Sequence, residues 1–173
     1  KANKVEELNC YEFKYVLNTN VAKKIQNEIE HFMNYDGYIH KDLGNAYFVR
    51  SLYFDNAFAT NFYEKVDGVR YRTKFRLRSY SQKNDKTSPI FLEQKGRHLN
   101  RVFKNRCTIE NEDLDMFYSE SRYSELLNTY QNEVIEDFIF QGYKKKLKPQ
   151  VLVDYIRKPF TSNYDSNFRI TFD

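Results

Sequence analysis

A run of alternating positive charges between Val69 and Tyr80 is the part of this sequence best suited to chemistry. In VRYRTKFRLRSY every second residue is basic, the basic positions being Arg70, Arg72, Lys74, Arg76 and Arg78. If the run is a strand, these side chains share one face, because successive side chains of a strand point to opposite faces. Neighbouring cations would then lie about 6.6 Å apart and would repel each other by roughly 0.6 kcal/mol in water. Such a row needs either solvent with counterions or an anionic partner.

Other segments repeat this combination of an apolar face and a mostly basic face. The charged positions are Glu93, Lys95 and Arg97 in FLEQKGR, Lys104 and Arg106 in VFKNR, Arg157 in VLVDYIR, and Arg169 with Asp173 in FRITFD. If these faces converge, the strands enclose a basic lumen, and helices can cover their apolar outer faces. Guanidinium groups bind phosphate oxygens bidentately and lysines supply point charge. A linear polyphosphate would suit such a lumen, whereas the alternative for each run is a solvated outer face.

The charge of the whole chain is only +4, but it is unevenly distributed. Residues 65–106 hold thirteen basic and three acidic residues, whereas residues 110–137 hold one basic and nine acidic residues. The two cysteines, Cys10 and Cys107, form no CxxC pair, which favours a reducing, cytoplasmic location. No segment approaches the roughly 20 apolar residues of a membrane span, and no GxxxxGK[ST] phosphate loop occurs. The excess of positive charge in residues 65–106 predicts an anionic partner.

Hydrophobic periodicity predicts a single α+β domain with a mainly antiparallel sheet. Strands are expected at residues 9–17, 47–55, 69–80, 90–97, 101–109, 151–157 and 168–173, with Gly96 in the connection between the fourth and the fifth. One helix is expected at residues 21–33, after the cap candidates Asn18 and Thr19, and another at residues 123–145.

The order of motifs resembles the VTC domain of polyphosphate polymerases over nearly the whole chain. The matching segments are YEFKY (Tyr11 to Tyr15), VRSLYFD, FYEKVDG, RTKFRLRSY, FLEQKGR, VFKNR, PQVLVDYIRKPF and FRITFD. The resemblance implies a single domain over residues 1–173 in the triphosphate tunnel metalloenzyme superfamily, with an antiparallel β-tunnel around a basic lumen. It also implies that ATP donates its γ-phosphoryl group to a growing polyphosphate chain in that lumen.

The resemblance also assigns residues to this chemistry. The implied catalytic residues are Lys14, Arg76, Arg78 and Lys95. Further implied phosphate ligands are Arg157 and Arg169, and Arg72, Lys74, Lys104 and Arg106 join them because they share the same faces as matched positions. The implied cofactor is Mn²⁺ or Mg²⁺, for which Glu12 and Glu93 face the lumen by parity, two residues from Lys14 and Lys95. An ion pair with these cations is the alternative role for either carboxylate.

Three other functions are compatible with the same residues. The domain could bind polyphosphate or an inositol phosphate without turnover, or hydrolyse triphosphate as other superfamily members do. RNA binding ranks lower, because Tyr71, Phe75 and Leu77 lie on the strand face opposite the cations. ATP and polyphosphate are therefore the expected partners, without nucleic acid. The family's tunnel uses eight strands where seven are counted here, so a missing closing strand is also expected.

Overall fold

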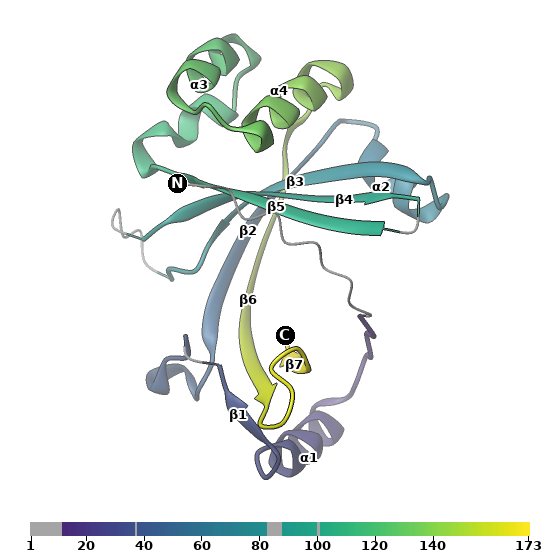
Figure 1. Cartoon of the computed structure of the whole chain (residues 1–173), viewed down its shortest axis with the longest axis vertical. Helices are drawn as coiled ribbons and strands as arrows, with labels where there is room; N and C mark the ends of the chain where they lie inside the picture. The colour runs from purple at the N-terminus through teal and green to yellow at the C-terminus, as the bar shows by residue number, and fades with distance from the viewer. Residues whose placement is uncertain (1–11, 37, 83–87, 100) are drawn as a thin grey trace. The chain divides into compact units, whose positions relative to one another are not determined.

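The computed structural model describes residues 12–36, 38–82, 88–99 and 101–173 (Figure 1). The described residues form two compact units, the first comprising Arg50–Val153 and the second residues 12–49 and Asp154–Asp173. Two strands, β2 (Tyr47–Asp55) and β6 (Lys148–Ser162), continue from one unit into the other. The expectation of a single domain stays a prediction.

The first unit is built on an antiparallel sheet of β2, β3 (Tyr71–Ser79), β4 (Ile90–His98) and β5 (Arg101–Ile109). These strands coincide with the expected ones to within two residues at each end, because each alternates apolar with polar side chains. The pair β3–β4 and the pair β4–β5 are each in register over nine residues. The long ladders hold every side chain of these strands on a defined face.

Helices cover one face of this sheet (Figure 1). After β5 come the 3-10 segments η2 (Asn111–Phe117) and η3 (Glu120–Arg122), and then α3 (Tyr123–Thr129) and α4 (Glu133–Lys145). The ring of Phe138 on α4 contacts Phe75 of β3 and Phe54 of β2 edge-on, with centroids 5.4 and 5.0 Å away. Leu77 and Leu92 belong to the same buried cluster. The apolar sheet face is thus the core of this unit.

The second unit is smaller. It contains α1 (Thr19–Ile29), β1 (Met33–Tyr35), η1 (Lys41–Leu43) and β7 (Arg169–Phe172), and both β1 and β7 pair antiparallel with the end of β6. Asn18 caps α1 as expected, its side chain accepting a hydrogen bond from the Val21 N–H at 2.9 Å. Ile29, Met33 and Phe160 form the buried cluster.

The strand pairing confirms the α+β class and the antiparallel sheet. In the described residues the order is β1-β6-β2-β3-β4-β5, with β7 attached to β6, so the sheet does not close on itself along this path. The open order agrees with the expected incomplete barrel.

One expected strand is wrong as far as the structure describes it. Residues 12–17 form no strand, and residues 9–11 of that prediction lie outside the described residues. Phe13 and Tyr15 alternate with Glu12 and Lys14, but both aromatic side chains are largely exposed. Alternation alone does not make a strand, because the backbone also needs a neighbouring strand to complete its hydrogen bonds.

Two connections also differ from expectation. Gly96 lies inside β4 opposite Phe103, where a Cβ would come within 2.0 Å of the Phe103 ring, so the absent side chain makes room for that ring. The helix expected over residues 123–145 is two helices, because Tyr130 adopts extended backbone and Asn132 starts α4 by accepting a hydrogen bond from the Val134 N–H. The short helix α2 (Thr60–Val66), which follows β2, was not predicted.

Candidate functional site: a cationic sheet face

The sheet face opposite α3 and α4 carries a cluster of eight basic residues. We call it the cationic face and define it by Arg72, Lys74, Arg76 and Arg78 of β3, Lys95 and Arg97 of β4, and Lys104 and Arg106 of β5. Paired residues of an antiparallel ladder point to the same face. Lys74 pairs with Lys95, which pairs with Lys104, so three lysines cross three strands in one line. The sequence prediction for these eight residues, that they share a face, is confirmed.

The two faces of β3 are sharply different. Phe75 and Leu77 are buried among the core side chains, whereas their neighbours Lys74 and Arg76 remain partly exposed on the other side. Arg78 is the exception among the cations, with only 5% of its surface exposed. The apolar residues therefore fix the orientation of the strand, and the strand in turn orients its cations.

Glu93 lies at the centre of the cationic face. Its side chain is 1% exposed, Oε2 accepts a hydrogen bond from Nε of Arg76 at 2.8 Å, and Nη2 of the same guanidinium forms an ion pair with Oε2 at 2.6 Å. Nη1 of Arg78 lies 3.6 Å from Oε2, and Nζ of Lys104 lies 3.4 Å from Oε1. Burial alone would raise the pKa of Glu93, but the charges of Arg76, Arg78 and Lys104 outweigh burial and hold that pKa below its ordinary value.

The arginines also bond to polar side chains of β2. Arg76 donates from Nη1 to the hydroxyl of Tyr53 at 2.8 Å, and Arg78 donates from Nε to the buried Ser51 hydroxyl at 3.1 Å. Burial lowers the pKa of Arg76, but the charges of Glu93 and Tyr53 and the hydrogen bonds to both side chains together raise it overall. Both guanidinium groups are therefore held in a fixed orientation by hydrogen bonds.

Arginines of the cationic face form cation–π contacts with aromatic rings on or beside it. The guanidinium carbon of Arg76 lies 5.6 Å from the Tyr53 ring centroid, and that of Arg106 lies 5.1 Å from the Phe91 centroid. Arg78 lies 6.0 Å from the ring of Tyr80. Such cation–π contacts use the ring faces that stacking bases would need.

The cations at one end of the face bond to nearby backbone. Arg72 donates from Nη1 to the Val69 carbonyl at 2.6 Å, and Arg97 donates from Nε to the Leu99 carbonyl at 2.8 Å. These two arginines, which are paired across β3 and β4, stabilise the strand ends, while Lys95 of β4 is exposed.

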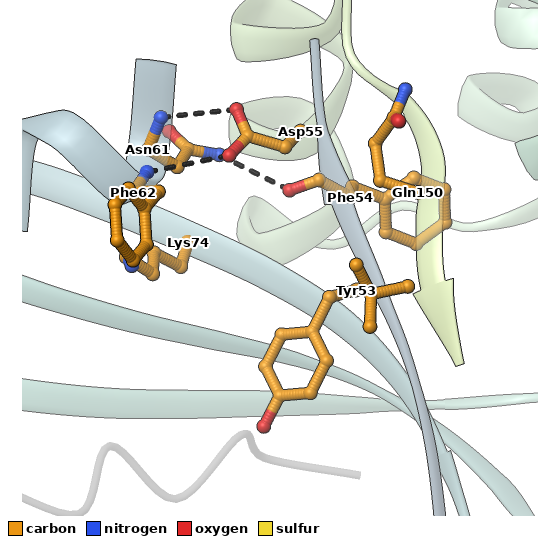
Figure 2. Close-up of a pocket in the computed structure, with 8 residues that line it drawn as sticks. Tyr53, Phe54, Asp55, Asn61, Phe62, Lys74 and Gln150 are labelled. Carbon is orange, nitrogen blue, oxygen red and sulfur yellow. Dashed lines mark hydrogen bonds between the residues drawn. The ribbon is translucent and has the colours of Figure 1, made fainter. Parts of the chain in front are cut away.

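A pocket of about 220 Å³ opens beside Lys74 (Figure 2). It is lined by Tyr53, Asp55, Asn61, Phe62, Lys74 and Gln150 among others. Phe62 is 55% exposed, so its ring is available to a ligand. Burial, followed by the charge of Lys65, holds the pKa of Lys74 below its ordinary value, against the opposing charge of Asp55.

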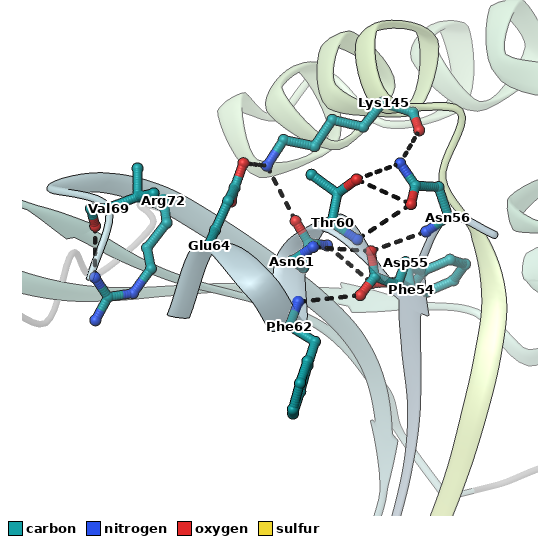
Figure 3. A network of polar contacts seen from close by, with 10 residues as sticks. All are labelled: Phe54, Asp55, Asn56, Thr60, Asn61, Phe62, Glu64, Val69, Arg72 and Lys145. Carbon is teal, nitrogen blue, oxygen red and sulfur yellow. Dashed lines mark hydrogen bonds and ion pairs between the residues drawn. The ribbon is translucent and has the colours of Figure 1, made fainter. Parts of the chain in front are cut away.

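Hydrogen bonds at the start of α2 hold the pocket wall in place (Figure 3). The carboxylate of Asp55 accepts from the backbone N–H groups of Asn61 and Phe62 at 3.0 and 3.3 Å. Lys145 of α4 donates from Nζ to Glu64 at 2.6 Å and to the Asn61 side chain at 3.0 Å. The sequence does not reveal this wall, because α2 has only seven residues and is too short for a helical period to show.

The remaining candidates belong to the second unit. Lys14 and Glu12 are exposed and form an ion pair at 3.6 Å. Arg157 binds the Asp173 carboxylate through Nε and Nη2, at 2.5 and 2.6 Å, and Arg169 is exposed. Burial would lower the pKa of Arg157, but the hydrogen bonds to Asp173 help raise it above its ordinary value. The functions assigned to these four residues stay predictions.

The side chains around Glu93 do not fit a divalent metal ion, because three cationic groups already lie within 3.6 Å of its oxygens. Within the described ranges, no three His, Cys, Asp or Glu side chains lie close enough together to hold a metal. The assignments of Glu12 and Glu93 as metal ligands stay predictions.

Fold and site together define an α+β protein with a strongly cationic sheet face. The chain belongs to the VTC domain family, whose model matches residues 9–173. Membership supports a function related to polyphosphate. A comparison with curated proteins gave no match. Among the described residues, no helix has both the length and the apolar composition needed to cross a membrane.

Proposed function

We propose that the domain binds the phosphate groups of ATP and polyphosphate on its cationic face and transfers the γ-phosphoryl group of ATP to the growing chain. The observation that carries this proposal is the charge of the face, which has eight cations, while β3, β4 and β5 contain a single acidic residue, Glu93. The family match, which covers nearly the whole chain, supports the same substrate class.

The chemistry asked of these residues is mainly charge neutralisation and alignment. In phosphoryl transfer, negative charge spreads over the oxygens of the transferred group, and fixed cations stabilise it without reorganising. Arg76 and Arg78 are held by Glu93, Ser51 and Tyr53, so their positions are set before the substrate arrives. Lys74, Lys95 and Lys104 form a line of point charges beside them that would hold a second phosphate group in place.

The pocket beside Lys74 would bind the nucleoside of ATP and so orient its phosphate groups along the cationic face. The Phe62 ring is available for stacking, and the amide of Gln150 can both donate and accept hydrogen bonds. With the nucleoside in this pocket, the first phosphate group would meet Lys74, and the remaining groups would extend toward Arg76 and Arg78.

The decisive experiment incubates the protein with ATP and Mn²⁺ and separates the products on a polyphosphate gel. A ladder of polymer supports the proposal, release of phosphate without polymer identifies a triphosphate hydrolase, and binding without either product identifies a binding module. Arg76→Gln should lower polymer formation at least about tenfold, the cost of losing a charged hydrogen bond.

The matched control is Arg122→Gln, because Arg122 lies between η3 and α3 and pairs with Asp115 and Glu125, away from the cationic face. It removes the same charge and should leave polymer formation unchanged. Equal losses in both variants would show that overall charge, and not this face, determines activity.

A further inference from the structure

The carboxylate of Glu93 is unusual in its degree of enclosure. It is buried, it is the only acidic residue of β3, β4 and β5, and cations of two neighbouring strands reach it. A buried charge is retained only when partners compensate it. Here the compensation is reciprocal, because the same carboxylate lowers the repulsion among the cations around it.

The two carboxylate oxygens are used differently. Oε2 accepts a hydrogen bond from Nε of Arg76 and forms an ion pair with its Nη2, whereas Oε1 is buried and accepts no hydrogen bond from the described residues, with Lys104 Nζ 3.4 Å away. Lys104 therefore contributes charge rather than a well-formed hydrogen bond, and it can move to another anion at little cost.

The hydrogen bonds of Arg76 leave part of its guanidinium for a ligand. Of five N–H groups, Nε and one on Nη2 bind Glu93, and one on Nη1 binds Tyr53. One N–H remains on each terminal nitrogen, the pair that binds phosphate oxygens in a fork. Glu93 and Tyr53 thus hold the guanidinium from one side and leave both terminal nitrogens able to donate.

We propose that Glu93 is a positioning residue that serves as an internal counter-anion, occupying in the unliganded protein the electrostatic place that substrate phosphate takes on binding. It orients Arg76, offsets the repulsion among Arg76, Arg78 and Lys104, and contributes no metal coordination. The inference rests on the proposed function, since it takes phosphate as the ligand of the face. A divalent ion on Glu93 would have to displace at least one of the three cations, at the cost of strong repulsion.

The test measures the thermal stability of wild type and Glu93→Gln with EDTA, with and without inorganic tripolyphosphate. Removing the charge leaves the guanidinium groups of buried Arg78 and partly buried Arg76 uncompensated, so Tm of the unliganded variant should fall by on the order of 10 °C. Tripolyphosphate supplies the missing anion, so it should raise Tm of the variant more than that of wild type. Salt without ligand should also raise Tm of the variant more than that of wild type. The reason is that salt screens the repulsion among Arg76, Arg78 and Lys104, which Glu93 no longer offsets.

The matched control is Glu64→Gln, which removes another largely buried, ion-paired carboxylate of the same unit, the partner of Lys145. Its Tm should fall as well, but tripolyphosphate should raise it by the same amount as wild type. If Glu93→Gln folds only in the presence of tripolyphosphate, the counter-anion role is supported. If it folds under no condition, Glu93→Asp replaces it, and the shorter side chain should give a smaller fall in Tm with the same enlarged response to tripolyphosphate.

The outcomes separate this inference from the proposed function. If tripolyphosphate does not raise Tm of wild type, the proposed function is contradicted. The counter-anion role is then tested only by whether salt raises Tm of Glu93→Gln more than that of wild type. A wild type that responds, with a Glu93→Gln response equal or smaller, overturns the inference. A stabilisation by Mn²⁺ that wild type shows and the variant loses would make Glu93 a metal ligand instead.

Discussion

At the scale of single residues, the site depends on charges that are held by other charges. Arg76, Arg78 and Lys104 contact Glu93 from β3 and β5. The guanidinium of Arg76 also donates a hydrogen bond to the Tyr53 hydroxyl. Fixed cations need no reorganisation when a phosphate arrives. The same arrangement makes the unliganded protein sensitive to the ionisation of one carboxyl group.

Acid should weaken the fold through Glu93. Its pKa is held below the ordinary value of 4.5 in the folded protein, so its contribution is complete above about pH 4.5 and is lost as pH falls through the folded pKa. The Tm difference between wild type and Glu93→Gln should therefore stay constant from neutral pH to about pH 4.5 and shrink as the pH is lowered further. A difference that stays constant down to acid pH would show that Glu93 does not titrate with these partners.

Lys74 should matter for ligands and not for stability. Lys74→Ala removes a partly exposed cation from the pocket and face, so tripolyphosphate affinity should fall about tenfold while Tm stays within a few degrees of wild type. The measurements are calorimetric titration and thermal denaturation. An unchanged affinity would remove Lys74 from the binding face.

At the scale of elements, the two faces of β3 have separate functions. Phe75→Ala is the counterpart of Lys74→Ala on the adjacent position, because Phe75 is fully buried against Phe138. We expect it to cost about 3–5 kcal/mol of unfolding free energy, measured by denaturant titration. Tripolyphosphate should still bind the folded fraction, and a stable Phe75→Ala protein that fails to bind would reverse the assignment of the two faces.

Gly96 is required by the packing of β4 on β5. A methyl group there would lie 2.0 Å from Cζ of Phe103, so Gly96→Ala must displace that ring. The expected loss is about 1–3 kcal/mol. Phe103→Leu in the same chain should recover part of this loss by making room for the methyl group. Denaturant titration of the single and double variants would measure it, and additive losses would contradict the proposed clash.

At the scale of the whole molecule, binding should be electrostatic and selective for phosphate chains. Affinity for tripolyphosphate should fall steeply between about 0.1 and 1 M salt, because the Debye length falls from about 10 to 3 Å over that range. An RNA oligomer of equal charge should bind more weakly, because Tyr53 and Phe91 are already stacked by Arg76 and Arg106. Tighter binding of the RNA, or binding indifferent to salt, would favour a nucleic-acid function.

The sequence by itself determined the strands of the first unit and the composition of the cationic face. The bounds of β2 and β5 agree with prediction, and Arg72 to Arg78 share a face as their spacing requires, because the two-residue period of a strand is local and strict. The density of cations and the family motifs predicted phosphate as the ligand class, and this stays a proposal.

The tertiary structure decided what no local period carries. Only the register of β3, β4 and β5 brings Lys104 and Arg78 to Glu93, and only the hydrogen bonds of α2 place Phe62 beside Lys74. The same reason explains the errors. Residues 12–17 alternate without forming a strand, and Gly96 lies within β4, because pairing partners and the space around a side chain are set by segments distant in the sequence.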